Sequence, residues 1–213
     1  FKKLAEGAHL CGDPGMQFDT TINDWHTVPE TARINASNPC SEFMFVDNTS
    51  CNLASLNLKK FMRQDGSFDI DLFRHACEVV ITAQEILVDR AGYPTEQIQA
   101  NSHKLRPLGL GYANLGALLM SLGYAYDSDA GRDYAATITA IMTGAAYAQS
   151  ARIAAFKSPF TDFKRNKKSM LRVMRKHQAA LRHVSPDHVP EAMLDGAEQV
   201  WARTVDLGKR HGY

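Results

Sequence analysis

Apolar residues recur every three or four positions along several long stretches of the chain. Between Phe68 and Asp89 this spacing predicts a helix with one buried face. Other predicted helices are followed by Gly12, Gly123 or Gly212, a residue that commonly ends a helix. The predicted helices cover residues 2–10, 68–89, 114–122, 127–156, 170–183 and 190–211, with Asp127 or Ser128 as the cap of the longest.

Short apolar runs between these helices predict strands over residues 43–46, 53–61 and 106–112. Residues 16–39 are polar and irregular, and we expect an ordered connection there. Short strands separated by long helices favour an α/β architecture. About three strands are too few to close a barrel. Together with the absence of an initial Met, this predicts that the chain is a portion of a longer protein.

Charge and composition argue against several classes of function, among them nucleic-acid binding and membrane insertion. The formal net charge of the 213 residues is +1, so no strong field draws the chain to nucleic acid or to an anionic membrane. Its apolar runs are too short to span a bilayer. The four cysteines form no CxxC pair, which favours reduced thiols and a cytoplasmic setting. No His pairs with another at i,i+4 or adjoins a Cys, so no metal site is expected.

One short segment carries unusual chemistry. Asn38, Cys40 and Glu42 alternate along the chain, and in an extended segment their side chains would share one face. A carboxylate beside a thiol raises the thiol pKa, which makes a poor thiolate nucleophile. The grouping suits a sulfur that carries a hydrogen atom while the carboxylate handles protons. From spacing alone, a loop with a buried structural cysteine remains the other interpretation.

The motif set resembles one enzyme family. The segment NPCSE (38–42), followed by SCNLASLNL (50–58), is similar to the active-site loop of adenosylcobalamin-dependent ribonucleotide reductases. The segments GDPG (12–15), RINAS (33–37) and RPLGLGY (106–112) also fit, in the family order. The resemblance implies that the chain is a single fragment, residues 1–213, of a ten-stranded α/β barrel. Its radical-bearing loop would cover about 35–46 and its helical remainder about 68–213.

The resemblance also implies residue roles. Cys40 would become a thiyl radical and remove the 3′-hydrogen of the substrate ribose. Glu42 would act as general base on the 3′-hydroxyl, and Asn38 would hold the ribose hydroxyls. Cys51 would be one of two thiols that supply reducing equivalents. Adenosylcobalamin would make the first radical, a thioredoxin-like protein or another dithiol would restore the thiols, and the substrate would be a ribonucleoside di- or triphosphate.

Several family elements are absent from the sequence. They are the upstream partner of Cys51, the loop that grips the substrate phosphates and a C-terminal cysteine pair. We therefore expect the isolated chain to be inactive without the remaining portions of the reductase. An orphan fragment that only folds and associates, or a different radical enzyme on the same barrel, are the alternatives.

Four other positions are given no part in the chemistry. Cys77 is predicted to be core, and no role is assigned to Cys11. The pair Gly109 and Gly111 lacks the third glycine of a dinucleotide loop, so close strand–helix packing is expected there.

Overall fold

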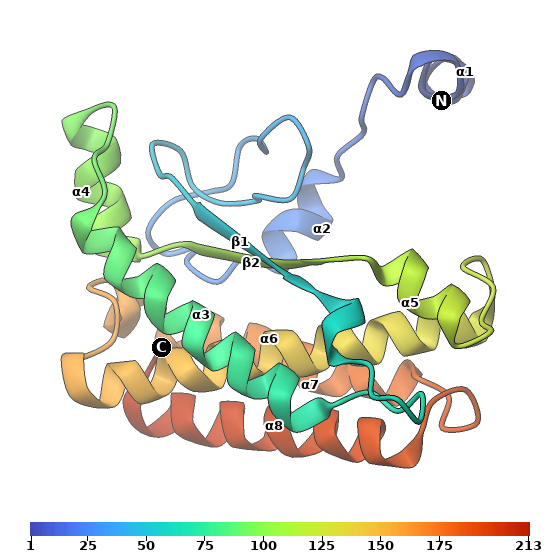
Figure 1. The fold of residues 1–213 in the computed structure, drawn as a ribbon. Coiled ribbons are helices and arrows are strands. Elements are labelled where there is room, and N and C mark those ends of the chain that lie inside the picture. The colour runs from blue at the N-terminus through green and yellow to red at the C-terminus, as the bar shows by residue number, and fades with distance from the viewer.

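The computed structural model describes residues 1–213 and has two parallel strands against a layer of helices (Figure 1). The helices α3, α6, α7 and α8 lie on one side of the strands, and the segment that precedes β1 loops over the other side. The elements in chain order are α1 (Lys2–Cys11), α2 (Asp19–Asp24), β1 (Asn52–Asn57), η1 (Leu58–Phe61), α3 (Ile70–Arg90), α4 (Glu96–Leu105), β2 (Leu108–Ala113), α5 (Leu115–Ser121), α6 (Asp129–Lys157), α7 (Phe163–Ala180), η2 (Leu181–His183) and α8 (Glu191–His211).

The two strands pair in parallel with Leu53 opposite Gly109 and Ser55 opposite Gly111. Parallel neighbours need a crossover connection, and α3 and α4 supply it here. The α/β class predicted from the sequence is confirmed. Two strands form instead of about three, because residues 43–46 make only an isolated bridge between Met44 and Ser37. The predicted strand at 43–46 is therefore wrong.

The core lies where α6 crosses α8. α6 is rich in small residues, and a Cβ on Gly144 would lie 2.7 Å from Val200 Cγ1. The glycine thus lets the two helices approach closely. Thr204 Oγ1 donates to Gly144 O at 2.7 Å across the same contact. Trp201 and Met193 of α8 are buried beside it, so this helix pair forms the base on which α3 and the strands are placed.

Local signals explain most helix ends. Ser128 Oγ accepts from Gly131 N and begins α6, as predicted. α8 ends at Gly212, whose φ of 84° suits a residue without a Cβ. α7 begins at Phe163, whereas the sequence predicted a start at residue 170. The first two turns were missed because the buried Asn166 interrupts the apolar pattern. Its Oδ1 accepts from Glu30 N at 3.0 Å.

Two short helices were not predicted from the sequence. α2 lies within the connection expected over 16–39, and α4 precedes β2. α1 stands apart from the other elements and buries no residue (Figure 1). None of the helices has the length and apolar character needed to cross a bilayer.

Candidate functional site

The segment that was predicted to carry the chemistry forms a tight turn. Ser41 N donates to Asn38 O at 3.1 Å, and Ser41 has a φ of 66°. Pro39 occupies the second position of this turn, which its fixed φ favours. Cys40 follows it and is exposed. The extended backbone expected for Asn38 to Glu42 is therefore wrong, although the segment does lie in a loop.

Asn38 fixes the two sides of the turn. Its Oδ1 accepts from Phe43 N at 3.0 Å, so the backbone N–H of Phe43 is taken by a side chain instead of a neighbouring strand. Phe43 N is therefore not available to a neighbouring strand, and pairing is confined to the bridge between Met44 and Ser37. Ser37 Oγ donates to Asn38 O at 2.8 Å, and Gln17 Nε2 donates to Ser41 Oγ at 2.5 Å. The turn that presents Cys40 is thus held from both ends.

The pKa of the Glu42 carboxyl group is shifted by neighbouring groups. The Asn38 side chain holds the pKa of Glu42 below its ordinary value, and the Glu42 backbone N–H acts in the same direction. Partial desolvation opposes both effects. Glu42 is exposed and ionised at neutral pH. It is therefore in the form that accepts a proton.

Cys51 lies just before β1 and is half-buried. Burial, and to a lesser extent the negative charge of Glu42, raise the pKa of its thiol to about 11. Cys51 therefore remains a thiol at neutral pH. Asn38 thus acts on Glu42, and Glu42 acts on Cys51. Cys40 is exposed in the turn and is not among the groups that shift either pKa.

Removing the charge of Glu42 should lower the pKa of Cys51. We expect Glu42→Gln to move the pH profile of Cys51 alkylation to lower pH, while burial keeps the pKa above 9.0. Alkylation followed by mass spectrometry measures the profile, and Asp47→Asn is the control because Asp47 is not among the groups that raise this pKa. An unchanged profile in Glu42→Gln would show that the two groups do not interact.

The same pKa shift sets the direction of a stability effect. The pKa of Cys51 in the folded chain is higher than the ordinary value of 9.0. The folded state therefore favours the neutral thiol over the thiolate, relative to the unfolded state. Its contribution to stability is fully present below about pH 9 and is lost as the pH rises toward about 11.

A cavity of about 600 Å³ opens beside Glu42. Its lining includes Glu85 and Arg106 together with apolar side chains of α6 and α7. Its volume lies within the range of small-molecule sites, about 300–1,000 Å³. Neither Cys40 nor Cys51 lines it. The cavity thus adjoins Glu42 but does not reach either cysteine of the candidate site.

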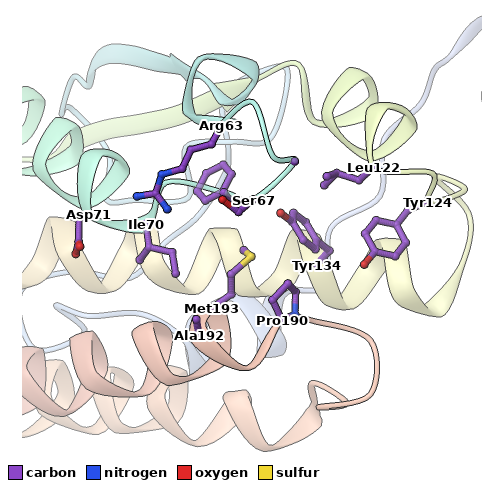
Figure 2. Close-up of a pocket in the computed structure, with 12 residues that line it drawn as sticks. Arg63, Ser67, Ile70, Asp71, Leu122, Tyr124, Tyr134, Pro190, Ala192 and Met193 are labelled. Atoms are coloured by element: carbon purple, nitrogen blue, oxygen red, sulfur yellow. The ribbon is translucent and has the colours of Figure 1, made fainter.

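A second cavity lies away from the turn. It measures about 330 Å³ and is lined by Arg63, Tyr124, Tyr134 and Met193 among others (Figure 2). None of the residues predicted for the site lines it, so it is separate from the candidate site. No group of three or more His, Cys, Asp and Glu side chains is placed to hold a metal ion.

Residues outside the predicted set support the site. Arg106 ends α4 with a φ of 52°, and its guanidinium pairs with Glu85 and with Asp89 of α3. Gln84 of α3 donates to backbone oxygens of both strands. Arg106 belongs to a motif that was noted in the sequence, but no contact was predicted for it. Gln84 could not be identified as a functional residue because it lies within a regular helical pattern.

The other glycine and cysteine predictions have clear outcomes. Cys77 is fully buried in the core, as predicted. Cys11 is exposed and free. Gly109 makes a close approach as expected, but to side chains of β1 and Cys51 rather than to a helix. Gly111 has more room around it, with Ser55 Oγ 3.7 Å from a built Cβ.

Comparisons with known proteins agree on one family. The model of the ribonucleotide reductase barrel domain matches residues 1–213. A vitamin B12-dependent ribonucleotide reductase of Rhodopirellula baltica is 51% identical over 99% of the chain and 20% of its own length. One of Streptomyces coelicolor is 50% identical over 100% of the chain and 22% of its own length.

A more distant relative has a narrower name. A vitamin B12-dependent ribonucleoside-diphosphate reductase of Mycobacterium tuberculosis is 34% identical over 76% of the chain and 23% of its own length. The chain therefore spans about a fifth of the length of the curated relatives it matches.

Proposed function

Because the chain belongs to the ribonucleotide reductase barrel-domain family, we propose that it supplies the radical-cysteine loop for the reduction of ribonucleotides to 2′-deoxyribonucleotides. The observation that carries this proposal is the exposed Cys40 on a braced turn, with an ionised Glu42 beside it and a protonated Cys51 within reach of the Glu42 charge. A hydrogen-atom carrier, a base and a reducing thiol are the groups that the reaction requires.

Each residue has one role. Cys40, as a thiyl radical, takes the 3′-hydrogen of the ribose and gives a hydrogen back to C3′ after the reduction, which restores the thiyl radical. Glu42 accepts the proton of the 3′-hydroxyl, and its lowered pKa keeps it ionised for this step. The Asn38 carboxamide, which already braces the turn, orients the ribose hydroxyls against Cys40 and Glu42.

The reducing equivalents come from two thiols. The 2′-hydroxyl leaves as water, two thiols give two electrons and two protons to the ribose, and a disulfide remains. Cys51 is one of these thiols, and its raised pKa keeps the hydrogen on the sulfur until it is needed. The second thiol belongs to a remaining portion of the reductase. A thioredoxin-like protein or another dithiol then reduces the disulfide by thiol–disulfide exchange.

The implied cofactor is adenosylcobalamin, which when bound supplies the first radical. The feature of the chain that fits it is the exposed Cys40 sulfur, which is free of hydrogen bonds and open to approach. Cys40 is the residue that we place against the cofactor. Four free cysteines suit a reducing, cytoplasmic setting, where nucleotides and dithiols are both available.

The test compares the full-length protein with the 213-residue chain. We expect the full-length protein to form deoxyribonucleotide from a ribonucleoside di- or triphosphate with adenosylcobalamin and a dithiol, and the isolated chain to form none. Lost hydrogen bonds to the substrate phosphates are each worth ~1.5–3 kcal/mol. Two or three such losses weaken binding on the order of a thousandfold.

Chromatography of the nucleotides after incubation measures the product, and omission of adenosylcobalamin is the control. No product from the full-length protein would refute the proposed activity. Product from the isolated chain would show that residues 1–213 are sufficient for it.

A further inference from the structure

The Cys51 sulfur occupies the space that a side chain at Gly109 would need. A Cβ built on Gly109 would lie 2.6 Å from Cys51 Sγ and 2.5 Å from Leu53 Cδ2. Real Cβ atoms essentially never approach other atoms so closely. A glycine within a strand often marks such a close approach. A side chain at this position would therefore displace the Cys51 sulfur or the Leu53 methyl group.

Gln84 joins both strands at the same level. Its Nε2 donates to Asn52 O at 3.0 Å and to Gly109 O at 2.8 Å. Asn52 Nδ2 returns a hydrogen bond to Gln84 O at 3.1 Å. One side chain of α3 is thus bonded to the residue that follows Cys51 and to the glycine that faces it. Both partners of Nε2 are carbonyl oxygens, so the side chain at this position must supply two N–H donors to satisfy them.

The hydrogen bonds of Gln84 leave two buried acceptors unpaired, which is unfavourable for the stability of the fold. Gln84 is 2% exposed, yet its Oε1 and the Oδ1 of Asn52 are buried without a hydrogen-bond partner. A buried acceptor without a hydrogen-bond partner destabilises the folded chain. An apolar side chain at Gln84 would avoid one of these costs but would leave two strand carbonyls without their donor. The polar network is thus maintained at the one end of β1 that adjoins Cys51.

We propose that Gly109 and Gln84 are positioning residues for the Cys51 thiol. Gly109 leaves the volume that the sulfur occupies, and Gln84 fixes the two strands at the level of that volume. The inference rests on the proposed role of Cys51 as a reductant. It adds that this thiol lies against Gly109, where a side chain would displace it, at the level at which Gln84 bonds to both strands.

The test uses Gly109→Ala in the full-length protein, with Gly111→Ala as the matched control. Both changes add one methyl group to the same face of β2, but a Cβ on Gly111 meets Ser55 Oγ at an ordinary 3.7 Å. Mass spectrometry reports the pH profile of iodoacetamide alkylation at each cysteine. Exposed Cys11 serves as the reference, and buried Cys77 reports unfolding.

We expect Gly109→Ala to displace the sulfur from its buried position and to shift the Cys51 profile to lower pH. The fraction of thiolate near neutral pH rises about tenfold for each unit by which the pKa falls, and alkylation becomes faster with it. Gly111→Ala should leave the profile of Cys51 unchanged. Equal profiles in wild type and Gly109→Ala, with Cys77 still protected, would overturn the inference.

A second pair of variants applies if Gly109→Ala exposes Cys77. Gln84→Met removes the donor, and Gln149→Met is its control because Gln149 Nε2 donates to Thr82 instead. The same shift of the Cys51 profile is expected in Gln84→Met alone, and a wild-type profile there would overturn the inference.

These measurements need neither substrate nor cofactor, so they are read independently of the proposed activity. In the active protein, Gly109→Ala should also form less deoxyribonucleotide for each 3′-hydrogen exchanged. A ratio equal to that of wild type would show that the thiol position does not matter for reduction. A shifted thiol profile in a protein without reductase activity would instead refute the proposed function and leave the positioning of Cys51 intact.

Discussion

Cys40→Ser in the full-length protein is expected to abolish deoxyribonucleotide formation. The O–H bond of serine is stronger than the S–H bond of cysteine. Forming a radical on the serine oxygen therefore requires more energy than the reaction supplies. Removal of a residue that reacts directly with the substrate lowers turnover on the order of 10⁶-fold. We therefore expect product at background, measured under the conditions that give full product with wild type.

The fold should survive this change. Cys40 is exposed and makes no hydrogen bond, and surface substitutions of this kind alter stability by about 0.5 kcal/mol or less. Cys11→Ser is the matched control, because Cys11 is also exposed and free. It should retain wild-type turnover. Full product from Cys40→Ser would end the assignment of the radical to this residue.

Cys51→Ser should separate the two halves of the reaction. A serine hydroxyl cannot form a disulfide, so the two-electron reduction of the ribose loses one of its thiols. Removal of the 3′-hydrogen by Cys40 does not need Cys51. We expect the deoxyribonucleotide yield to fall to background while exchange of the 3′-hydrogen continues near the wild-type rate.

Two assays on one sample check this result, namely product yield and label exchange. Normal product from Cys51→Ser would assign the reducing thiol to another residue and leave the Cys40 assignment untouched. Loss of both product and exchange would indicate that Cys51 supports the structure of the turn. Alkylation of the buried Cys77 would then report whether the core has opened.

The long helices were predictable because their signals are local. α6 has a Ser128 cap and α8 a terminal Gly212, and both show an apolar face repeated over many turns. α4 also has a readable cap, since Thr95 accepts from Ile98 N. It was missed because it buries only Ser102 and Leu105, which gives too few apolar positions for a recognisable period.

The site was predictable in its residue types but only partly in its geometry. A cysteine flanked by Asn38 and Glu42 was visible in the sequence, whereas the turn depends on Asn38 Oδ1 accepting from Phe43 N. The influence of Glu42 on Cys51 arises between residues nine positions apart that approach only in the folded chain. Gln84 acts from α3 on both strands, a contact that no local pattern encodes.

Hydrogen exchange at the 3′ carbon of the substrate tests the central claim most directly. The full-length protein, adenosylcobalamin and a dithiol are incubated with a ribonucleotide that carries a label at the 3′ hydrogen, and label transferred to water is measured. We predict transfer with wild type and with Cys51→Ser, and none with Cys40→Ser. Transfer by Cys40→Ser at the wild-type rate would contradict the claim that Cys40 removes this hydrogen.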